Sequence, residues 1–487
     1  MIKIALVVDK RDSKFGFAIS SFLKKRYDVK LYDIGCLKKD EDFFKLQKEL
    51  DYEPLIVKEE LDNKVKKEAV NLSYLKVLEE KYGNPNLWPY VWADRYIMGQ
   101  YPKYEYSFPG PGIPHEEILK RLQVCFREIS KAFEEKKPDW IIFPTLGSLE
   151  SVVLYGLAKK TGIKILYFDF PRIKNTMLFT DNCFNQFTQV YQIFDSIRKG
   201  ERQSQFREKA VSFLKEFREK PYLHRYFIPQ KQKTSFLKRI VLSVIYFWRF
   251  RKRRSPHNYS DYLKNRFTRI FRKLRGIKGI FEEPKEGEDF AYFPLHYEPE
   301  TATMLYAPFH THQIALIQNI AKSLPINFKL YVKEHFSMLY YRPFSYYEEL
   351  KKIPNVRLIN PAVDSVSLAK KSKLVLTITG TAGWEAILLS KPVITFGQVF
   401  YNKLSRVTNC QRLEDLPQTI KESLEKPPVS EEELIDFLSA IFEKSIRFDY
   451  AYFWETASFK EIEESEDFKN FVVFLAKELN LKPVSYF

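Results

Sequence analysis

A turn of small residues directly after an apolar run is the clearest candidate for ligand chemistry in this chain. The apolar run spans Leu374–Ile378 and is typical of a buried strand, and the turn that follows it is Thr379–Thr381. Small residues let the backbone turn sharply, and Thr381 is expected to N-cap a helix over about Ala382–Leu389. The unpaired N–H groups at the start of that helix would lie at the positive end of its dipole, where an anion binds readily. An ordinary strand–helix unit without a ligand is the alternative.

Two further polar segments follow predicted strands in the same region. His296 and Glu298 come after a strand predicted over residues 290–294, and Lys333 and His335 come after one over residues 328–332. Because the carboxyl ends of parallel strands converge on one crevice, we expect these side chains to meet the turn. Cations and helix N–H groups would bind a phosphate, and Glu385, one turn into the helix, would accept hydrogen bonds from ribose hydroxyls. The set favours a nucleotide as ligand.

Each of these side chains also fits a purely structural role. His335 is consistent with a hydrogen-bonded structural histidine, and Lys333, Glu298 and Glu300 are consistent with solvated strand ends and loops. A metal site built from histidines is a further alternative, but no pair has a firm metal-ligand spacing on one helix, so we predict no metal. The histidines concerned are His296, His310, His312 and His335. A Walker loop, a GxGxxG turn and a nucleophile elbow are all absent from the sequence, which argues against ATPases, dehydrogenases and hydrolases.

Four segments resemble those of bacterial capsule polysaccharide biosynthesis proteins, which are related to the β-Kdo transferases of capsule assembly. They are Tyr292–Glu300, Lys333–His335, Thr379–Ala386 and Lys391–Gly397, and the match covers about residues 290–400. The N-terminal half is matched only by its layout. The resemblance implies an α/β, GT-B-like fold with two facing Rossmann-like domains, the donor nucleotide on the C-terminal one and the acceptor on the N-terminal one.

The resemblance also implies a donor. A CMP-activated sugar, Kdo or a related acid sugar, is favoured, and a UDP-sugar is the second choice. Bacterial sialyltransferase-like enzymes carry His-Pro at the position of His335–Phe336, where Phe replaces Pro in this chain. The expected donor-binding residues are Lys333, His335, Thr379, Gly380, Thr381, Ala382, Gly383 and Glu385.

The expected reaction is sugar transfer without a metal or any cofactor besides the nucleotide-sugar substrate. Protein cations and a helix dipole would neutralise the leaving phosphate. The acceptor hydroxyl needs a base, or the enzyme needs a nucleophile if configuration is retained by a covalent route. The candidates are Glu150, which follows a predicted strand of the first domain, and His296 and Glu298 from the other side of the cleft.

Length and composition set the frame for this site. The 487 residues predict two or three domains, and a hydrophobic content of 45% is enough for large cores. We expect an N-terminal Rossmann-like acceptor domain at 1–200, a basic helical insert or linker at 201–284, a C-terminal Rossmann-like nucleotide-sugar domain at 285–412, and helices at 413–487 that pack back on the first domain. The four cysteines are scattered without a CxxC pair, and no signal peptide or membrane span is predicted, which together favour the cytoplasm.

The positive charge is concentrated in the insert. Residues 231–280 hold 16 Lys and Arg against one acid, so this segment accounts for most of the net charge of +17. The apolar centre of residues 236–254 is too short to span a bilayer, but it suits a helix that lies in an anionic membrane surface. The predicted membrane-facing residues are Lys238, Arg239, Trp248, Arg249, Arg251, Lys252, Arg253 and Arg254. A hairpin packed on the protein core and RNA binding are the alternatives, and we predict no nucleic-acid partner because no recognised module accompanies the patch.

The favoured function is therefore a glycosyltransferase that is peripheral on the inner face of the cytoplasmic membrane and acts on a lipid-linked or glycan acceptor. A nucleotide-sugar epimerase of the UDP-GlcNAc 2-epimerase type shares the GT-B layout, but it would handle a soluble substrate and would not need the basic insert. A non-catalytic, membrane-associated scaffold in polysaccharide export would bind no nucleotide. The response to nucleotides separates these functions.

Overall fold

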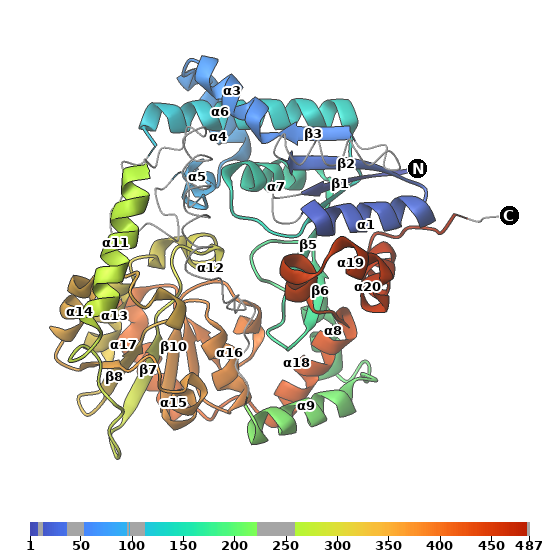
Figure 1. The fold of residues 1–487 in the computed structure, drawn as a ribbon. Helices are drawn as coiled ribbons and strands as arrows, with labels where there is room; N and C mark the ends of the chain where they lie inside the picture. The colour runs from blue at the N-terminus through green and yellow to red at the C-terminus, as the bar shows by residue number, and fades with distance from the viewer. Residues whose placement is uncertain (8–12, 37–52, 95–96, 98–112, 222–258, 485–487) are drawn as a thin grey trace.

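The chain forms two α/β units, each built on one β-sheet. The computed structural model describes residues 1–7, 13–36, 53–94, 97, 113–221 and 259–484, and Figure 1 shows the N-terminal unit above the C-terminal one. The predicted fold class, α/β with two Rossmann-like units, is confirmed. The predicted membrane-facing residues between Lys238 and Arg254 lie outside the described residues.

The N-terminal sheet has the strand order β13-β6-β5-β4-β1-β2-β3. Its strands are β1 (Ile2–Val7), β2 (Val29–Cys36), β3 (Glu53–Val57), β4 (Trp140–Phe143), β5 (Lys164–Asp169), β6 (Thr176–Thr180) and β13 (Ser445–Arg447). The pairs from β3 to β5 are parallel, whereas β6 runs antiparallel to β5, and β13 runs antiparallel to β6. A strand from the C-terminal part of the chain therefore closes one edge of the first sheet.

Helices cover both faces of this sheet. One hydrophobic core lies beneath α3, α4, α5, α6 and α7, and a second lies beneath α1, α19 and α20. Their bounds are α1 (Ser13–Arg26), α3 (Lys58–Lys67), α4 (Leu72–Tyr82), α5 (Trp88–Trp92), α6 (His115–Lys136), α7 (Leu149–Thr161), α19 (Phe459–Glu464) and α20 (Glu466–Glu478). β3 lies in a charged part of the sequence whose composition favours a helix, and α5 lies in an aromatic, proline-rich part whose composition favours a loop.

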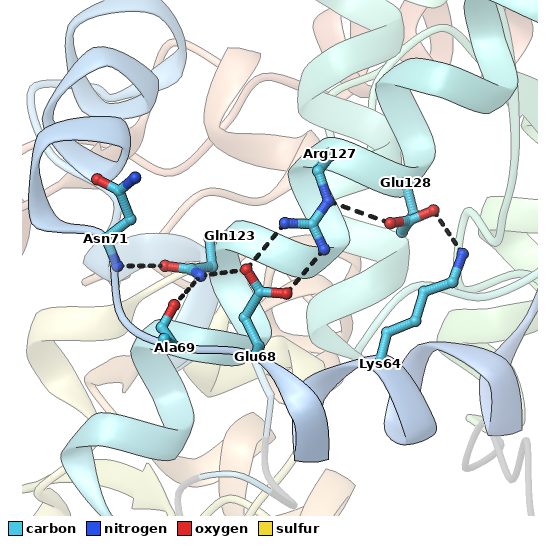
Figure 2. Close-up of polar contacts among 7 residues, drawn as sticks. All are labelled: Lys64, Glu68, Ala69, Asn71, Gln123, Arg127 and Glu128. Atoms are coloured by element: carbon cyan, nitrogen blue, oxygen red, sulfur yellow. Dashed lines mark hydrogen bonds and ion pairs between the residues drawn. The ribbon is translucent and has the colours of Figure 1, made fainter.

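A polar network fixes the connection between α3 and α4 on the surface of α6 (Figure 2). Arg127 donates to both carboxylate oxygens of Glu68 at 2.9 Å, and Gln123 donates to Glu68 at 2.6 Å. The Gln123 side-chain oxygen accepts the Asn71 N–H at 3.0 Å, and Lys64 pairs with Glu128 at 2.7 Å. These contacts account for the packing of α3 against α6, and they belong to the outer layer of the N-terminal unit.

The C-terminal sheet is wholly parallel, with the order β12-β11-β10-β7-β8-β9. Its strands are β7 (Phe290–Pro294), β8 (Lys329–Lys333), β9 (Val356–Ile359), β10 (Leu374–Thr377), β11 (Val393–Thr395) and β12 (Val407–Asn409). Successive β7 residues enter different cores: Phe290 and Tyr292 pack on one face, Ala291 and Phe293 on the other. Burial on both faces explains why these strands read as continuous apolar runs.

Helices also cover both faces of the second sheet. α13, α14 and α17 pack on one face, and α15, α16, α18, α8 and α9 line the core on the other. Their bounds are α8 (Thr188–Arg198), α9 (Arg207–Glu219), α13 (Gln313–Ser323), α14 (Phe344–Lys351), α15 (Ser365–Lys371), α16 (Thr381–Leu388), α17 (Leu416–Glu425) and α18 (Glu431–Lys444). A short helix, α12 (Thr301–Met304), follows β7, and α11 (Tyr259–Arg275) precedes the sheet.

The chain crosses between the two units more than once. α8 and α9 come after the N-terminal sheet but pack on α18, beside the C-terminal unit (Figure 1). After α18 the chain returns through β13, and α19 and α20 then lie against α1. The predicted domain boundaries at 200, 284 and 412 stay predictions. Among the helices that the structure describes, none is long and apolar enough to cross a membrane.

Candidate active site

The candidate site lies where the chain direction of the C-terminal sheet reverses. β7 and β10 are neighbours, but the chain leaves β7 toward β8 and leaves β10 toward β11. Connections that diverge in this way open a crevice at the carboxyl ends of the two strands. His296 follows β7 and Thr379 follows β10, and the Thr379 N–H donates to His296 Nε2 at 3.2 Å. The sequence-predicted segments after β7 and β10 are therefore brought together.

The turn between β10 and α16 depends on small residues. Gly380 is the N-cap and Thr381 is the first helical residue, so the predicted Thr381 cap was wrong by one position. The Gly380 N–H donates to Thr377 Oγ1 at 3.0 Å, and a Cβ added at Gly380 would lie only 2.6 Å from that oxygen. A Cβ at Gly383 would lie 2.4 Å from the hydroxyl of Tyr401, which donates to the Gly380 carbonyl at 2.7 Å. The backbone thus bends tightly enough to present the start of α16 to the crevice.

His296 is neutral and buried beneath this turn. Its Nε2 accepts the Thr379 N–H, which assigns the proton to Nδ1. The pKa of His296 is lowered to about 3, chiefly by burial and then by His335 and the positive charges of Arg342 and Arg172. The sequence analysis placed His296 among the catalytic candidates. Since its basic nitrogen is occupied by the backbone, the contacts favour a role in holding the turn.

A buried arginine, Arg342, ties the ends of β7 and β8 together. Its guanidinium donates to the Glu334 carboxylate at 2.5 Å, to the His296 carbonyl at 2.7 Å and to the Glu298 carboxylate at 3.2 Å. The side chains of Arg342 and Glu334 have no exposed surface. The Tyr347 hydroxyl also donates to Glu334, at 2.7 Å. Sequence reasoning missed Arg342 and Glu334; the one signal was a single cation within the aromatic segment 340–347.

These contacts also define Glu298. It is buried beside Arg342, and burial raises its pKa while the Arg342 charge opposes that rise. Glu298 was a predicted catalytic residue, but its position favours service as the partner of Arg342.

Lys333 lies at the carboxyl end of β8 among carboxylates. Its side chain is buried, and burial lowers its pKa, while the negative charges of Asp364, Glu334 and Glu385 act in the opposite direction. Glu385 is buried in the second turn of α16, close enough to influence Lys333 and Tyr292. The predicted phosphate and ribose residues Lys333 and Glu385 therefore lie close enough for their charges to interact.

Two further histidines, His335 and His312, accept hydrogen bonds from nearby backbone N–H groups. His335 is exposed at the rim, where its Nδ1 accepts the Ser337 N–H at 3.3 Å. His312 caps α13 by accepting the Ala315 N–H at 3.1 Å. Across the residues that the structure describes, no group of three or more His, Cys, Asp or Glu is arranged to hold a metal ion.

The N-terminal unit reaches this region through the loop before α7. The Thr301 hydroxyl, at the start of α12, donates to the Leu146 carbonyl at 3.1 Å. Glu150 lies in the first turn of α7, four residues beyond that contact. The Leu149 N–H at the helix start donates to Asp94 at 2.8 Å, so a protein carboxylate already sits at this helix dipole. The N-terminus of α7 is therefore less suited to binding an anion, and the candidate functional group that it contributes is the Glu150 carboxylate.

Arg172 is a second residue that sequence reasoning did not single out. It follows β5 of the N-terminal unit in a left-handed conformation, with φ of 58°, which is uncommon for arginine. Its charge opposes the burial-driven rise in the pKa of Asp169 in its own unit and of Tyr401 in the other, and it contributes to the low pKa of His296. The charge of Arg172 thus acts on residues of both units, Asp169 in its own and His296 and Tyr401 in the other.

A family match covers the site and the segments before it. Residues 203–427 match the model of the capsule polysaccharide biosynthesis protein family, which confirms the resemblance over this part of the chain. The matched range contains β7 to β12, the Arg342 network and α16. No curated protein matches the chain.

Solved structures with a similar layout fall into two groups. The β-Kdo 2,7 transferase of Thermosulfurimonas dismutans KpsC is 11% identical, with 72% of this chain and 89% of that chain covered and a TM-score of 0.37. The β-Kdo 2,4 transferase of the same protein is 11% identical, with 62% and 79% covered and a TM-score of 0.34. The UDP-GlcNAc 2-epimerase of Neisseria meningitidis is 12% identical, with 98% and 100% covered and a TM-score of 0.23. Because these scores are low, the argument for function rests on the family match and the site.

The first prediction concerns acid stability. The folded pKa of His296, about 3, lies below its unfolded value near 6.5, so the unfolded state binds the extra proton between these values. The stability contributed by neutral His296 is therefore lost as pH falls through this window, by about 1.4 kcal/mol per pH unit. His296→Gln keeps an acceptor for Thr379 but removes the titration. When unfolding free energies are measured in urea from pH 7 to pH 4, the difference between wild type and variant should narrow. A difference that stays constant with pH would contradict the titration of His296.

The second prediction concerns Arg342. Arg342→Met leaves the buried Glu334 carboxylate without its cation, and we expect unfolding free energy to fall by about 3–5 kcal/mol. Adding Glu334→Gln removes the uncompensated charge and should restore at least half of the loss. Arg198→Met is the control, since Arg198 pairs with Asp436 while half exposed, and it should cost about 1 kcal/mol or less. Equal losses in the single and double variants would disprove the buried-charge account.

Proposed function

From the match of residues 203–427 to capsule polysaccharide biosynthesis proteins, we propose that the chain is a GT-B-type glycosyltransferase of capsule or surface polysaccharide biosynthesis. The carrying observation is the crevice between β7 and β10, where His296, Thr379 and the start of α16 converge inside the matched region. A nucleotide-sugar donor binds there, and a lipid-linked or glycan acceptor approaches from the N-terminal unit.

The start of α16 binds the donor phosphate. The N–H groups after Gly380 lie at the positive end of the helix dipole, and Arg172 adds a cation from the N-terminal unit. Lys333 forms the opposite wall, and Glu385 accepts hydrogen bonds from the ribose. Fixed dipoles and cations of this kind stabilise a leaving phosphate in a water-poor site, which supports transfer without a metal.

The charge balance of the crevice supports a donor with one phosphate. Three carboxylates, Asp364, Glu334 and Glu385, influence Lys333, and Arg342 is already paired with Glu334 and Glu298. Among the described residues, Arg172 is the further cation that acts on this region, so its positive charge matches one phosphate better than the two of a nucleoside diphosphate. A CMP-sugar, whose leaving group carries a single phosphate, fits this balance better than a UDP-sugar.

Glu150 is the proposed base, or nucleophile if configuration is retained. Glu150 lies in the first turn of α7, four residues beyond Leu146, whose carbonyl accepts the Thr301 hydroxyl where the two units meet. A carboxylate at this position acts on the acceptor side of the bound donor.

The third prediction is a nucleotide preference. Thermal shift with CMP, CDP, UDP and GDP should give the largest stabilisation with CMP, because only a ligand that binds the folded state raises its stability. Lys333→Met should weaken CMP binding by about tenfold or more, since it removes a charged partner. Lys322→Met, an exposed lysine at the end of α13, is the matched control and should change nothing. No shift with any nucleotide would favour a scaffold, and a UDP preference with 2-epimerisation of UDP-GlcNAc would favour an epimerase.

The fourth prediction separates chemistry from binding. Glu150→Gln should lower sugar transfer by about a hundredfold or more while the CMP thermal shift stays unchanged. Glu135→Gln, near the end of α6, is the control for losing a partly exposed carboxylate. Assays with and without EDTA test metal independence in the same samples. Normal turnover by Glu150→Gln would remove this residue from the mechanism.

A further inference from the structure

Helix α11 is attached to the C-terminal unit through its arginines. Arg272 is buried and donates to the Tyr341 carbonyl at 2.5 Å and to the Tyr340 carbonyl at 3.3 Å. Arg269 bonds the Tyr341 hydroxyl, and the Arg275 guanidinium stacks on the Phe344 ring at 4.4 Å. Arg272 is thus turned toward the protein, whereas Arg269 and Arg275 contact it from exposed positions.

Helix α11 also carries an exposed apolar stripe. Phe267, Ile270, Phe271 and Leu274 are 67%, 47%, 65% and 81% exposed. Their spacing of three, four and seven residues places them on one face of the helix. Scattered exposed apolar residues are ordinary, but a contiguous stripe on one helix marks an interaction surface. Figure 1 shows α11 at the edge of the molecule, rising from the C-terminal unit toward the level of α6.

The surroundings of the stripe are strongly positive. The exposed cations beside it are Arg269, Lys273 and Arg275 on α11 and Lys278 just beyond its end. A cavity of about 250 Å³ opens at its C-terminal end and is lined in part by Arg275, Lys278 and Lys351. An apolar stripe bordered by cations complements an anionic lipid surface, where the rings enter the acyl boundary and the cations meet headgroup phosphates.

We propose that α11 is a membrane-docking helix, and that its stripe binds an anionic lipid surface. Charge complementarity between the exposed cations around the stripe and an anionic lipid surface favours this occupant. A second copy of this chain is a less suitable occupant, because it would have to present an acidic patch to the cations around the stripe. The proposal concerns where the protein works and holds with or without the proposed transferase activity.

The test is vesicle co-sedimentation of the full chain. Wild type should bind vesicles of phosphatidylcholine mixed with phosphatidylglycerol, bind phosphatidylcholine vesicles poorly, and lose binding as salt is raised. Phe267→Ser combined with Phe271→Ser should weaken binding by about tenfold or more, because two rings no longer leave water. Leu72→Ser combined with Ile326→Ser removes equally exposed apolar side chains on other elements and should bind as wild type does.

The remaining outcomes overturn the proposal. Undiminished vesicle binding by the α11 variant would show that the docking surface lies outside the stripe. Absence of vesicle binding by the wild type would disprove membrane docking. A lower unfolding temperature of the α11 variant would mean that a segment of this chain covers the stripe. A change of oligomeric state without vesicles would mean that a second copy does. The CMP thermal shift of the same variant should equal that of wild type, so failure here and failure of the proposed function are distinguishable.

Discussion

The buried guanidinium of Arg342 is the constraint around which the C-terminal site is organised. Arginine cannot lose its proton in a protein, so a side chain without exposed surface must be surrounded by acceptors. Those acceptors come from the ends of two strands: Glu334 after β8, and Glu298 with the His296 carbonyl after β7. Satisfying one charge therefore fixes where both strands end and leaves a polar wall on an otherwise apolar sheet. Since buried ion pairs add little net stability, their main effect here is on geometry.

The second constraint is the contact between the units. Asn185, in a left-handed conformation, donates to Asp169 at 3.0 Å and accepts the Phe400 N–H at 3.2 Å, and the Phe187 and Phe400 rings stack at 4.7 Å. One Asp169 oxygen has no hydrogen bond, and burial raises the pKa of this carboxyl to about 6. A left-handed Asn185 and a costly buried acid are retained where the units meet. These contacts favour one arrangement of the two units.

The parallel core of the C-terminal unit was predictable because its signals are local. Strands β7, β8 and β10 are apolar runs that end in polar residues, and the order of strands then brings His296 to Thr379. The N-terminal sheet was harder, because β6 and β13 are five and three residues long and pair across more than 250 positions of sequence. Such pairs are determined by tertiary contacts, and a short segment carries no periodicity that reports them. β3 is hard to predict for the same reason, since the sequence of a five-residue edge strand between charged segments resembles that of a helix.

The site residues divide along the same line. Residue types and strand ends indicated which polar groups lie close together. They did not indicate which of these groups form hydrogen bonds or ion pairs with each other. His296 and Glu298 were predicted to be catalytic because the sequence does not reveal their partners. The Thr379 N–H donates to His296, and Arg342 donates to Glu298. Arg342, eight residues beyond Glu334, and Arg172, in another unit, have no spacing that points to the crevice.

The arrangement has a consequence for how a ligand would bind. The start of α16 belongs to one unit and Arg172 to the other, so an anion held by both lowers the free energy of the arrangement in which the units meet at Leu146 and Thr301. A ligand can shift an equilibrium only by its difference in affinity between the two states, and a group contacted by one unit alone would produce no such shift. In the proposed complex, Arg172 would be the residue that converts anion binding into a force between the units. Binding of the donor in the C-terminal crevice would then be coupled to the approach of Glu150, the proposed base.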